Sequence, residues 1–240
     1  MVGYTSVMAV VTKLGSLMLA IILLVAATAA APADTRKEAV MQNTTLPPPR
    51  IEGPVSVETA LAQRRSVRAF APRALALGQL AQILWAAQGI TGSRWPLRTA
   101  PSAGALYPLE VYIVAGQVSG LAAGIYRYRP ADHALTAVAT GDQREPLARA
   151  ALGQGWMARA PVVLAITGVV ARTATKYGQR AERYVFMEAG HAAQNIYLQV
   201  QADGLGTTAV GAFRDAAVRA LLELSGDEMP LYLMPVGVPR

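Results

Sequence analysis

Apolar residues recur along the chain with two different spacings, and each spacing predicts a different kind of element. Helical spacing predicts helices over residues 56–63, 77–87 and 181–202, with Ser56 and Gly89 as end signals of the first two. Alternating or continuous apolar runs predict strands over residues 107–114, 124–129, 134–138, 161–167 and 231–236. Residues 205–213 are small and β-like, and short helices are expected to begin at Asp142 and Asp215.

These elements predict a fold class. Strands and helices alternate loosely, and the strands at 124–129 and 134–138 are close enough to form a hairpin. With 53% apolar residues in 240, the chain can bury one sizeable core. We therefore predict a single α+β domain with a central mixed, mainly antiparallel sheet flanked by helices.

Composition excludes several kinds of site. The chain has no cysteine, which rules out disulfides, thiolate metal sites and a cysteine nucleophile. It has only two histidines, far apart, so no metal site is predicted. The net charge of +7 comes from dispersed arginines, which favours a solvated basic surface with a few phosphate-facing arginines over nucleic-acid binding.

The N-terminal segment differs from the rest of the chain. Residues 1–31 carry no acid and one cation, Lys13, and they pass from a long apolar stretch into small residues, as in a secretory signal peptide. An uncleaved membrane anchor would look similar. Either one predicts a location at the cell envelope, in the periplasm or anchored; a start assigned too far upstream would leave the protein in the cytoplasm. Residues 32–54 are polar and proline-rich, typical of a linker or of an arm laid over a partner subunit.

Two segments carry the main candidate chemistry. The first is a turn of small residues between two prolines, where backbone N–H groups can approach a ligand closely: Pro101, Ser102, Ala103 and Gly104. The second offers guanidinium and hydroxyl donors suited to phosphate: Arg64, Arg65, Ser66 and Arg68. Taken alone, the first could be a structural loop and the second an ordinary basic surface. Glu110, just after the first segment, could be a catalytic base, but a structural pairing with an arginine is expected.

Three further segments follow in order. Lys176 and Tyr177 precede the long helix and could move a proton, or could belong to a solvated loop. Residues 188–198 form the middle of that helix, with small residues for close packing. Residues 204–213 are glycine-rich, and the chain ends on Arg240.

Together the five segments resemble the nitroreductase family, and more closely its SagB-type branch of azoline-oxidising dehydrogenases, from about residue 55 to 240. The resemblance implies a nitroreductase-like fold over residues 55–240, an intertwined homodimer and bound FMN. It implies FMN contacts by Arg64, Arg65, Ser66, Arg68, Pro101, Ser102, Ala103, Gly104, Ala209, Val210, Gly211, Ala212 and Arg240. It also implies that Lys176 and Tyr177 are the acid–base residues of catalysis.

The resemblance implies two-electron hydride chemistry on a small molecule or an azoline-containing peptide. General nitroreductases usually carry a glutamate where Gly211 stands, which favours the azoline branch. No Gly-x-Gly-x-x-Gly motif follows a strand, so any NAD(P)H would bind only transiently. Two alternatives stay open: a general NAD(P)H-dependent nitro or quinone reductase, and a non-catalytic flavin-binding scaffold.

Overall fold

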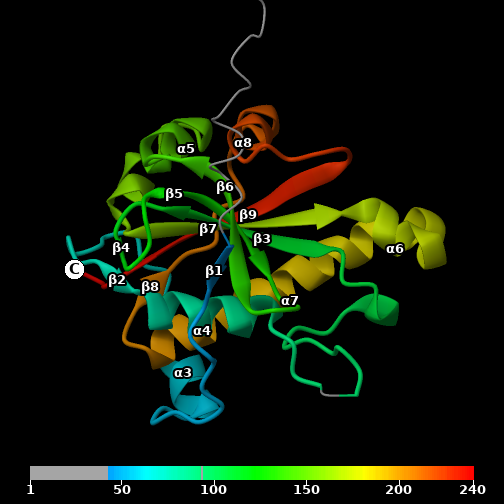
Figure 1. The fold of residues 1–240 in the computed structure, drawn as a ribbon, viewed down its shortest axis with the longest axis horizontal. Coiled ribbons are helices and arrows are strands. Elements are labelled where there is room, and N and C mark those ends of the chain that lie inside the picture. The colour runs from blue at the N-terminus through cyan, green and yellow to red at the C-terminus, as the bar shows by residue number, and fades with distance from the viewer. Residues whose placement is uncertain (1–42, 93) are drawn as a thin grey trace, which may run out of the picture. The chain divides into compact units, whose positions relative to one another are not determined.

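A seven-stranded sheet forms the centre of the fold in the computed structural model, which describes residues 43–92 and 94–240 (Figure 1). Its strand order is β1-β6-β5-β3-β7-β9-β8, and every neighbouring pair is antiparallel. The strands are β1 (Asn43–Thr45), β3 (Leu109–Ala115), β5 (Gly124–Arg129), β6 (Ala134–Thr140), β7 (Val162–Val169), β8 (Gly206–Thr207) and β9 (Glu228–Gly237). A separate parallel pair joins β2 (Leu75–Ala76) to β4 (Val118–Ser119).

Helices cover both faces of this sheet. On one face lie α4 (Leu77–Gln88) and α7 (Ala181–Ala202), and on the other lie α5 (Arg144–Ala150) and α8 (Asp215–Leu221) (Figure 1). The remaining helices are α3 (Val57–Gln63), which packs against α7, and α6 (Val170–Tyr177), which follows β7. The architecture is the predicted nitroreductase-like α+β layering.

The long helix α7 has the bounds that its apolar spacing predicts. Val185, Ala189, Ala192 and Ile196 lie on one stripe and are buried in the core against the sheet. Truncating a buried isoleucine such as Ile196 to alanine typically costs about 2–5 kcal/mol. The helix is therefore a firm support for any side chain on its other faces.

Several local predictions are confirmed and some are shifted. The Ser56 hydroxyl accepts the Thr59 N–H at the start of α3, and β5 and β6 form the expected hairpin. Gly89 ends α4, although with an ordinary negative φ; its lack of a side chain is needed because a β-carbon there would lie 2.2 Å from the Trp85 ring. Within residues 205–213, only Gly206 and Thr207 form a named strand.

The expected linker over residues 32–54 is wrong for its described part, residues 43–54. Asn43–Thr45 pair with β6 as an edge strand, and Leu46 is buried. The Arg50 guanidinium lies 2.6 Å from the Asp203 carboxylate. This stretch belongs to the domain because its backbone and side chains find partners on it.

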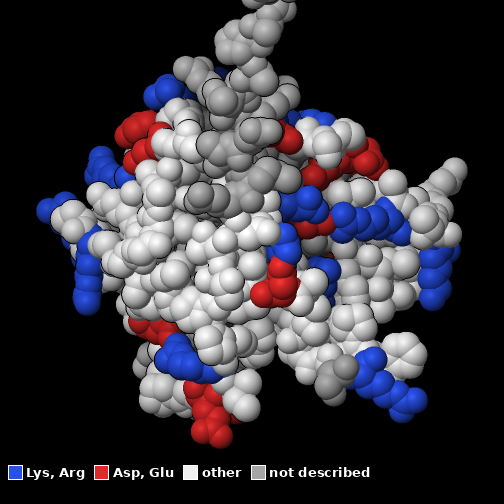
Figure 2. All heavy atoms as spheres, viewed as in Figure 1, with Lys and Arg blue, Asp and Glu red and all other residues white. Residues whose placement is uncertain are grey.

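The expected signal peptide or anchor over residues 1–31 lies outside the described residues. Among the helices of the described part, none combines the length and the apolar character that a membrane span requires. Figure 2 shows basic side chains scattered over one face with acidic ones among them, in line with the dispersed arginines of the sequence.

Candidate functional site

The segment that carries Arg64, Ser66 and Arg68 follows α3 and lies against β8. Ser66 forms a parallel bridge with Thr207, and the Val67 N–H donates to the Thr207 carbonyl at 2.9 Å. Gly206 makes this approach possible, because a β-carbon there would lie 2.6 Å from the Val67 side chain. The fold thus joins two segments about 140 residues apart.

The Tyr197 hydroxyl holds this junction together. It accepts the Ala209 N–H at 2.7 Å and lies 3.4 Å from the Ser66 Oγ, while the Arg64 guanidinium lies 5.2 Å from the centre of its ring. Burial raises the pKa of Tyr197, but its hydrogen bonds with Ser66, Thr208 and the Ala209 N–H, together with the Arg64 charge, lower the pKa overall. We call Arg64, Ser66, Tyr197, Thr208 and Ala209 the arginine loop cluster.

The cations around this cluster are available to a ligand. Among the described residues, no carboxylate lies within ion-pair distance of Arg64, Arg68 or Arg240. The Arg240 N–H donates to the Ala69 carbonyl at 3.1 Å, so the C-terminal residue lies beside the loop. Arg65 differs, because its guanidinium donates to the Ala62 and Arg64 carbonyls at the end of α3.

Residues 209–212, which are expected to contact the flavin ring, form two pairs that differ in whether their backbone N–H groups have an acceptor. The N–H groups of Ala209 and Val210 are already used, by the Tyr197 hydroxyl and by the Leu233 carbonyl at 2.9 Å. Gly211 and Ala212 are exposed, and within the described residues their N–H groups have no acceptor. Only these two can donate to a ligand.

The second candidate loop is held from inside by a carboxylate. Glu188 on α7 is 4% exposed, and its Oε1 accepts the Ala103 N–H at 2.8 Å. The Ser102 hydroxyl accepts the Tyr107 N–H at 2.9 Å and so closes the turn. Burial raises the pKa of Glu188, and the hydrogen bonds from Ala103 and Ser102 only partly offset it.

Lys176 and Tyr177 lie at the end of α6, directly against this loop, rather than in a loop of their own. Gly104 has a φ of +63°, and a β-carbon there would lie 3.1 Å from both the Lys176 Cδ and the Tyr177 hydroxyl. Lys176 is exposed, and Tyr177 packs edge-to-face on Tyr184 at 4.9 Å. We call Ser102, Ala103, Gly104, Lys176, Tyr177 and Glu188 the glycine loop cluster.

The predicted site residues therefore form two clusters on one helix. Glu188 and Tyr197 are nine residues apart on α7, which separates them by about 13 Å along the helix axis. The sequence interpretation assigned no role to either residue. For Glu188 the sequence holds a signal, because this carboxylate directly precedes Ala189 of the buried apolar stripe.

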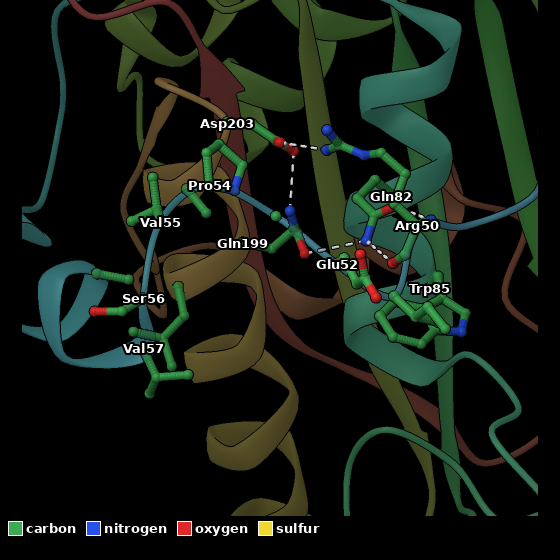
Figure 3. Close-up of a pocket in the computed structure, with 15 residues that line it drawn as sticks. Arg50, Glu52, Pro54, Val55, Ser56, Val57, Gln82, Trp85, Gln199 and Asp203 are labelled. Atoms are coloured by element: carbon green, nitrogen blue, oxygen red, sulfur yellow. Dashed lines mark hydrogen bonds and ion pairs between the residues drawn. The ribbon is translucent and has the colours of Figure 1, made fainter.

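A cavity of about 270 Å³ between residues 50–57, α4 and α7 contains none of the predicted site residues (Figure 3). Several of its polar groups bind one another: Arg50 pairs with Asp203, and the Gln82 amide donates to the Arg50 carbonyl and to Gln199 at 3.1 and 3.2 Å. Within the described residues, no group of acidic or histidine side chains could hold a metal ion.

Comparison with known proteins identifies the family. The model of the family described as "Nitroreductase family" matches residues 61–238. The nitroreductase-family protein MJ1384 of Methanocaldococcus jannaschii is 46% identical over 183 residues, covering 76% of this chain and 91% of that protein. The trifolitoxin operon protein TfxC of Rhizobium leguminosarum is 25% identical over 192 residues, 74% of this chain and 54% of TfxC.

Solved structures share the fold. A nitroreductase-family crystal structure from Ralstonia eutropha superposes with a TM-score of 0.71 at 29% identity, covering 82% of this chain and 90% of that one. The Escherichia coli microcin synthetase McbBCD complex, solved with truncated pro-MccB17 bound, contains a chain with a TM-score of 0.63 at 24% identity. Coverage is 89% of this chain and 84% of the synthetase chain.

Proposed function

Because the chain belongs to the nitroreductase family of oxidoreductases, we propose that it binds FMN at the arginine loop cluster and uses it for two-electron oxidation or reduction. The observation that carries this proposal combines two features. Arg64, Arg68 and Arg240 have no carboxylate partner within the part of the chain that the structure describes, and the N–H groups of Gly211 and Ala212, which are near the same cluster in sequence, are available as donors. An anionic phosphate and a flat polar ring need both kinds of donor.

The residues present fit FMN. The Thr207 hydroxyl is fully buried beside Ser66 and has no partner among the described residues, so this junction holds an unsatisfied polar group next to the exposed donors. Arg64, Ser66 and Arg68 would hold the phosphate, and the N–H groups of Gly211 and Ala212 would bind the ring edge. When bound, the flavin supplies hydride chemistry, and the protein supplies binding, orientation and proton control.

Lys176 and Tyr177 are the proposed proton-transfer residues. Their position against Gly104 places an ammonium group and a phenol beside the loop that the family uses to line the ring. Lys176 remains exposed and Tyr177 half-buried, so both can meet a substrate.

The separation of the two clusters along α7 supports a homodimer. A site that needs both clusters is more easily completed by two copies than by one, with the glycine loop cluster of one copy serving the flavin of the other. Phe186 and Met187 on α7 are about half exposed, at 48% and 53%, and offer apolar surface for such contact.

For the substrate we propose SagB-like oxidation of a small molecule or an azoline-containing peptide. The Lys176–Tyr177 pair and Gly211 in place of a glutamate support it, as does likeness to TfxC and to the McbBCD complex with its bound pro-MccB17. A general NAD(P)H-dependent nitro or quinone reductase is the second candidate, which the closer identity to MJ1384 and the Ralstonia protein favours. We also propose, from residues 1–31, that the protein works at the cell envelope.

The first experiment is the visible absorption spectrum of the purified protein. Flavin bands, with FMN released on denaturation, are expected. A colourless protein that also fails to bind added FMN would leave only a nitroreductase-like scaffold. Given a flavoprotein, oxidation of an azoline peptide by oxygen and reduction of a nitroarene or quinone by NADPH are then measured side by side, because the two candidate functions predict opposite preferences.

A further inference from the structure

A second cavity, of about 480 Å³, lies where β3 begins and β5 ends, beside Ile90, Pro96 and Arg98. Ten residues line it, among them Glu110, Arg127 and Arg129. None of them belongs to the arginine loop cluster or to the glycine loop cluster. Three are arginines, so the cavity differs in charge from the one in Figure 3.

The acidic groups near this cavity do not balance its arginines. Glu110, predicted to pair with one arginine, pairs with two: the Arg127 guanidinium at 3.0 Å and that of Arg172 at 2.5 Å. Asp132 pairs with Arg129. Among the described residues, the lining itself carries three arginines and one carboxylate, an excess of two positive charges. Outside the lining, Arg172 adds to this excess, and the Asp132 and Glu228 carboxylates offset part of it.

Arg98 carries the least compensated of these charges. Its guanidinium donates to the Gln88 side-chain oxygen at 2.8 Å and lies 4.6 Å from the centre of the Tyr107 ring. Among the described residues it has no carboxylate within ion-pair distance. Burial lowers the pKa of Arg98, which the more distant Glu110 carboxylate only partly offsets. A partly desolvated cation gains most from an anion that enters beside it.

Four of the other lining residues are apolar, and Tyr128 and Thr136 add one hydroxyl each. Ile90, Pro96, Pro130 and Ala131 contribute no charge and no side-chain donor, so they suit the carbon part of a ligand. We propose that this cavity binds a small organic anion carrying two negative charges, held by Arg98, Arg127 and Arg129. A dicarboxylate and a phosphate monoester share this chemistry. The proposal does not depend on flavin binding, because none of these residues contacts the arginine loop cluster.

The test is calorimetric titration of the full chain as purified, at low ionic strength, with succinate and separately with phenyl phosphate. Arg127→Gln should weaken binding by about tenfold, since it removes a guanidinium that can form charge-assisted hydrogen bonds. Arg129→Gln, at an exposed position, should weaken it by about threefold without affecting folding. Tighter binding of one probe identifies a dicarboxylate or a phosphate ester as the natural class.

Two control variants locate the binding. Arg149→Gln removes an exposed cation on α5 and should not change the affinity of the probes by more than about twofold. Arg68→Gln removes a cation from the loop proposed to hold the FMN phosphate, and it reports any binding of phenyl phosphate at that loop instead of in the cavity. Circular dichroism confirms that each variant is folded. The proposal is overturned if neither probe binds, if Arg127→Gln and Arg129→Gln bind as the unmodified protein does, or if Arg68→Gln alone abolishes binding.

Discussion

The arginine loop cluster and the glycine loop cluster share helix α7 but are stabilised in opposite ways. In the first, the Tyr197 hydroxyl accepts a backbone N–H, and the surrounding cations have no carboxylate partner among the described residues. In the second, the buried carboxylate of Glu188 binds the loop backbone. One cluster keeps its positive charge for a ligand, whereas the other uses a negative charge internally to fix a loop.

This difference assigns binding to one cluster and proton transfer to the other. The largest expected effect therefore comes from the glycine loop cluster. Lys176→Ala or Tyr177→Phe should lower turnover by about 10²–10⁴-fold, the range for loss of a general acid or base, while flavin content stays unchanged. Steady-state kinetics and the flavin-to-protein absorbance ratio check this. Arg180→Ala is the control, because Arg180 is an exposed cation in the short connection between α6 and α7. An equal loss of turnover in this variant would contradict a specific role for Lys176.

The next largest effect concerns retention of the flavin. Arg68→Glu should weaken FMN binding by about a hundredfold or more, because it replaces a charge-assisted donor with a repelling carboxylate. Fluorescence titration of the apoprotein with FMN measures the change. Arg65→Glu is the matched control, because the Arg65 guanidinium already donates to the end of α3. Unchanged retention in Arg68→Glu would contradict the proposed phosphate site.

A smaller effect is expected where Glu188 binds the loop. Glu188→Ala leaves the Ala103 N–H without its acceptor, and loss of a buried partner costs about 1–3 kcal/mol. Thermal unfolding should then show a melting temperature lower by about 2–4 °C for each kcal/mol. Glu188→Gln keeps an acceptor oxygen and should therefore lose less thermal stability than Glu188→Ala.

The pH dependence of stability tests the same contact between Glu188 and the loop. Since burial raises the pKa of Glu188 in the folded protein, the folded state favours the protonated carboxyl. The contribution of Glu188 to the free energy of unfolding is fully present below its pKa of 4.5 in the unfolded chain. It is lost as the pH rises through the raised pKa of the folded protein. Urea unfolding across this window should therefore show a fall in stability that Glu188→Gln lacks; identical profiles would speak against a raised pKa.

The smallest effect is expected at Tyr197. Tyr197→Phe removes one acceptor for the Ala209 N–H, worth about 0.5–1.5 kcal/mol, so FMN affinity should fall by about two- to tenfold. Tyr184→Phe, on the same helix beside Tyr177, should leave affinity unchanged. Ultraviolet titration should also show one phenol ionising below the usual value of 10, absent in Tyr197→Phe.

Local patterns in the sequence predict the elements better than they predict the site. The bounds of α7 and the hairpin of β5 and β6 follow from spacing and turn residues, which act over a few neighbours. Helix α6 was missed, because Val170–Tyr177 is short and polar and its burial depends on contact with α7. Asn43–Thr45, within the expected linker, form an edge strand because β6, about 90 residues away, offers them hydrogen bonds.

The sequence by itself determined the family, the layered fold and the segments that carry donors, because residue types and their spacing are local properties. Only the tertiary structure decided how those segments combine. It placed Ser66 beside Thr207, put Lys176 against Gly104 and turned Arg65 back onto its own helix. Of residues 209–212, it left the Gly211 and Ala212 N–H groups without an acceptor among the described residues. The physical reason is that pairing and burial depend on contacts between residues far apart in the chain, which no local pattern encodes.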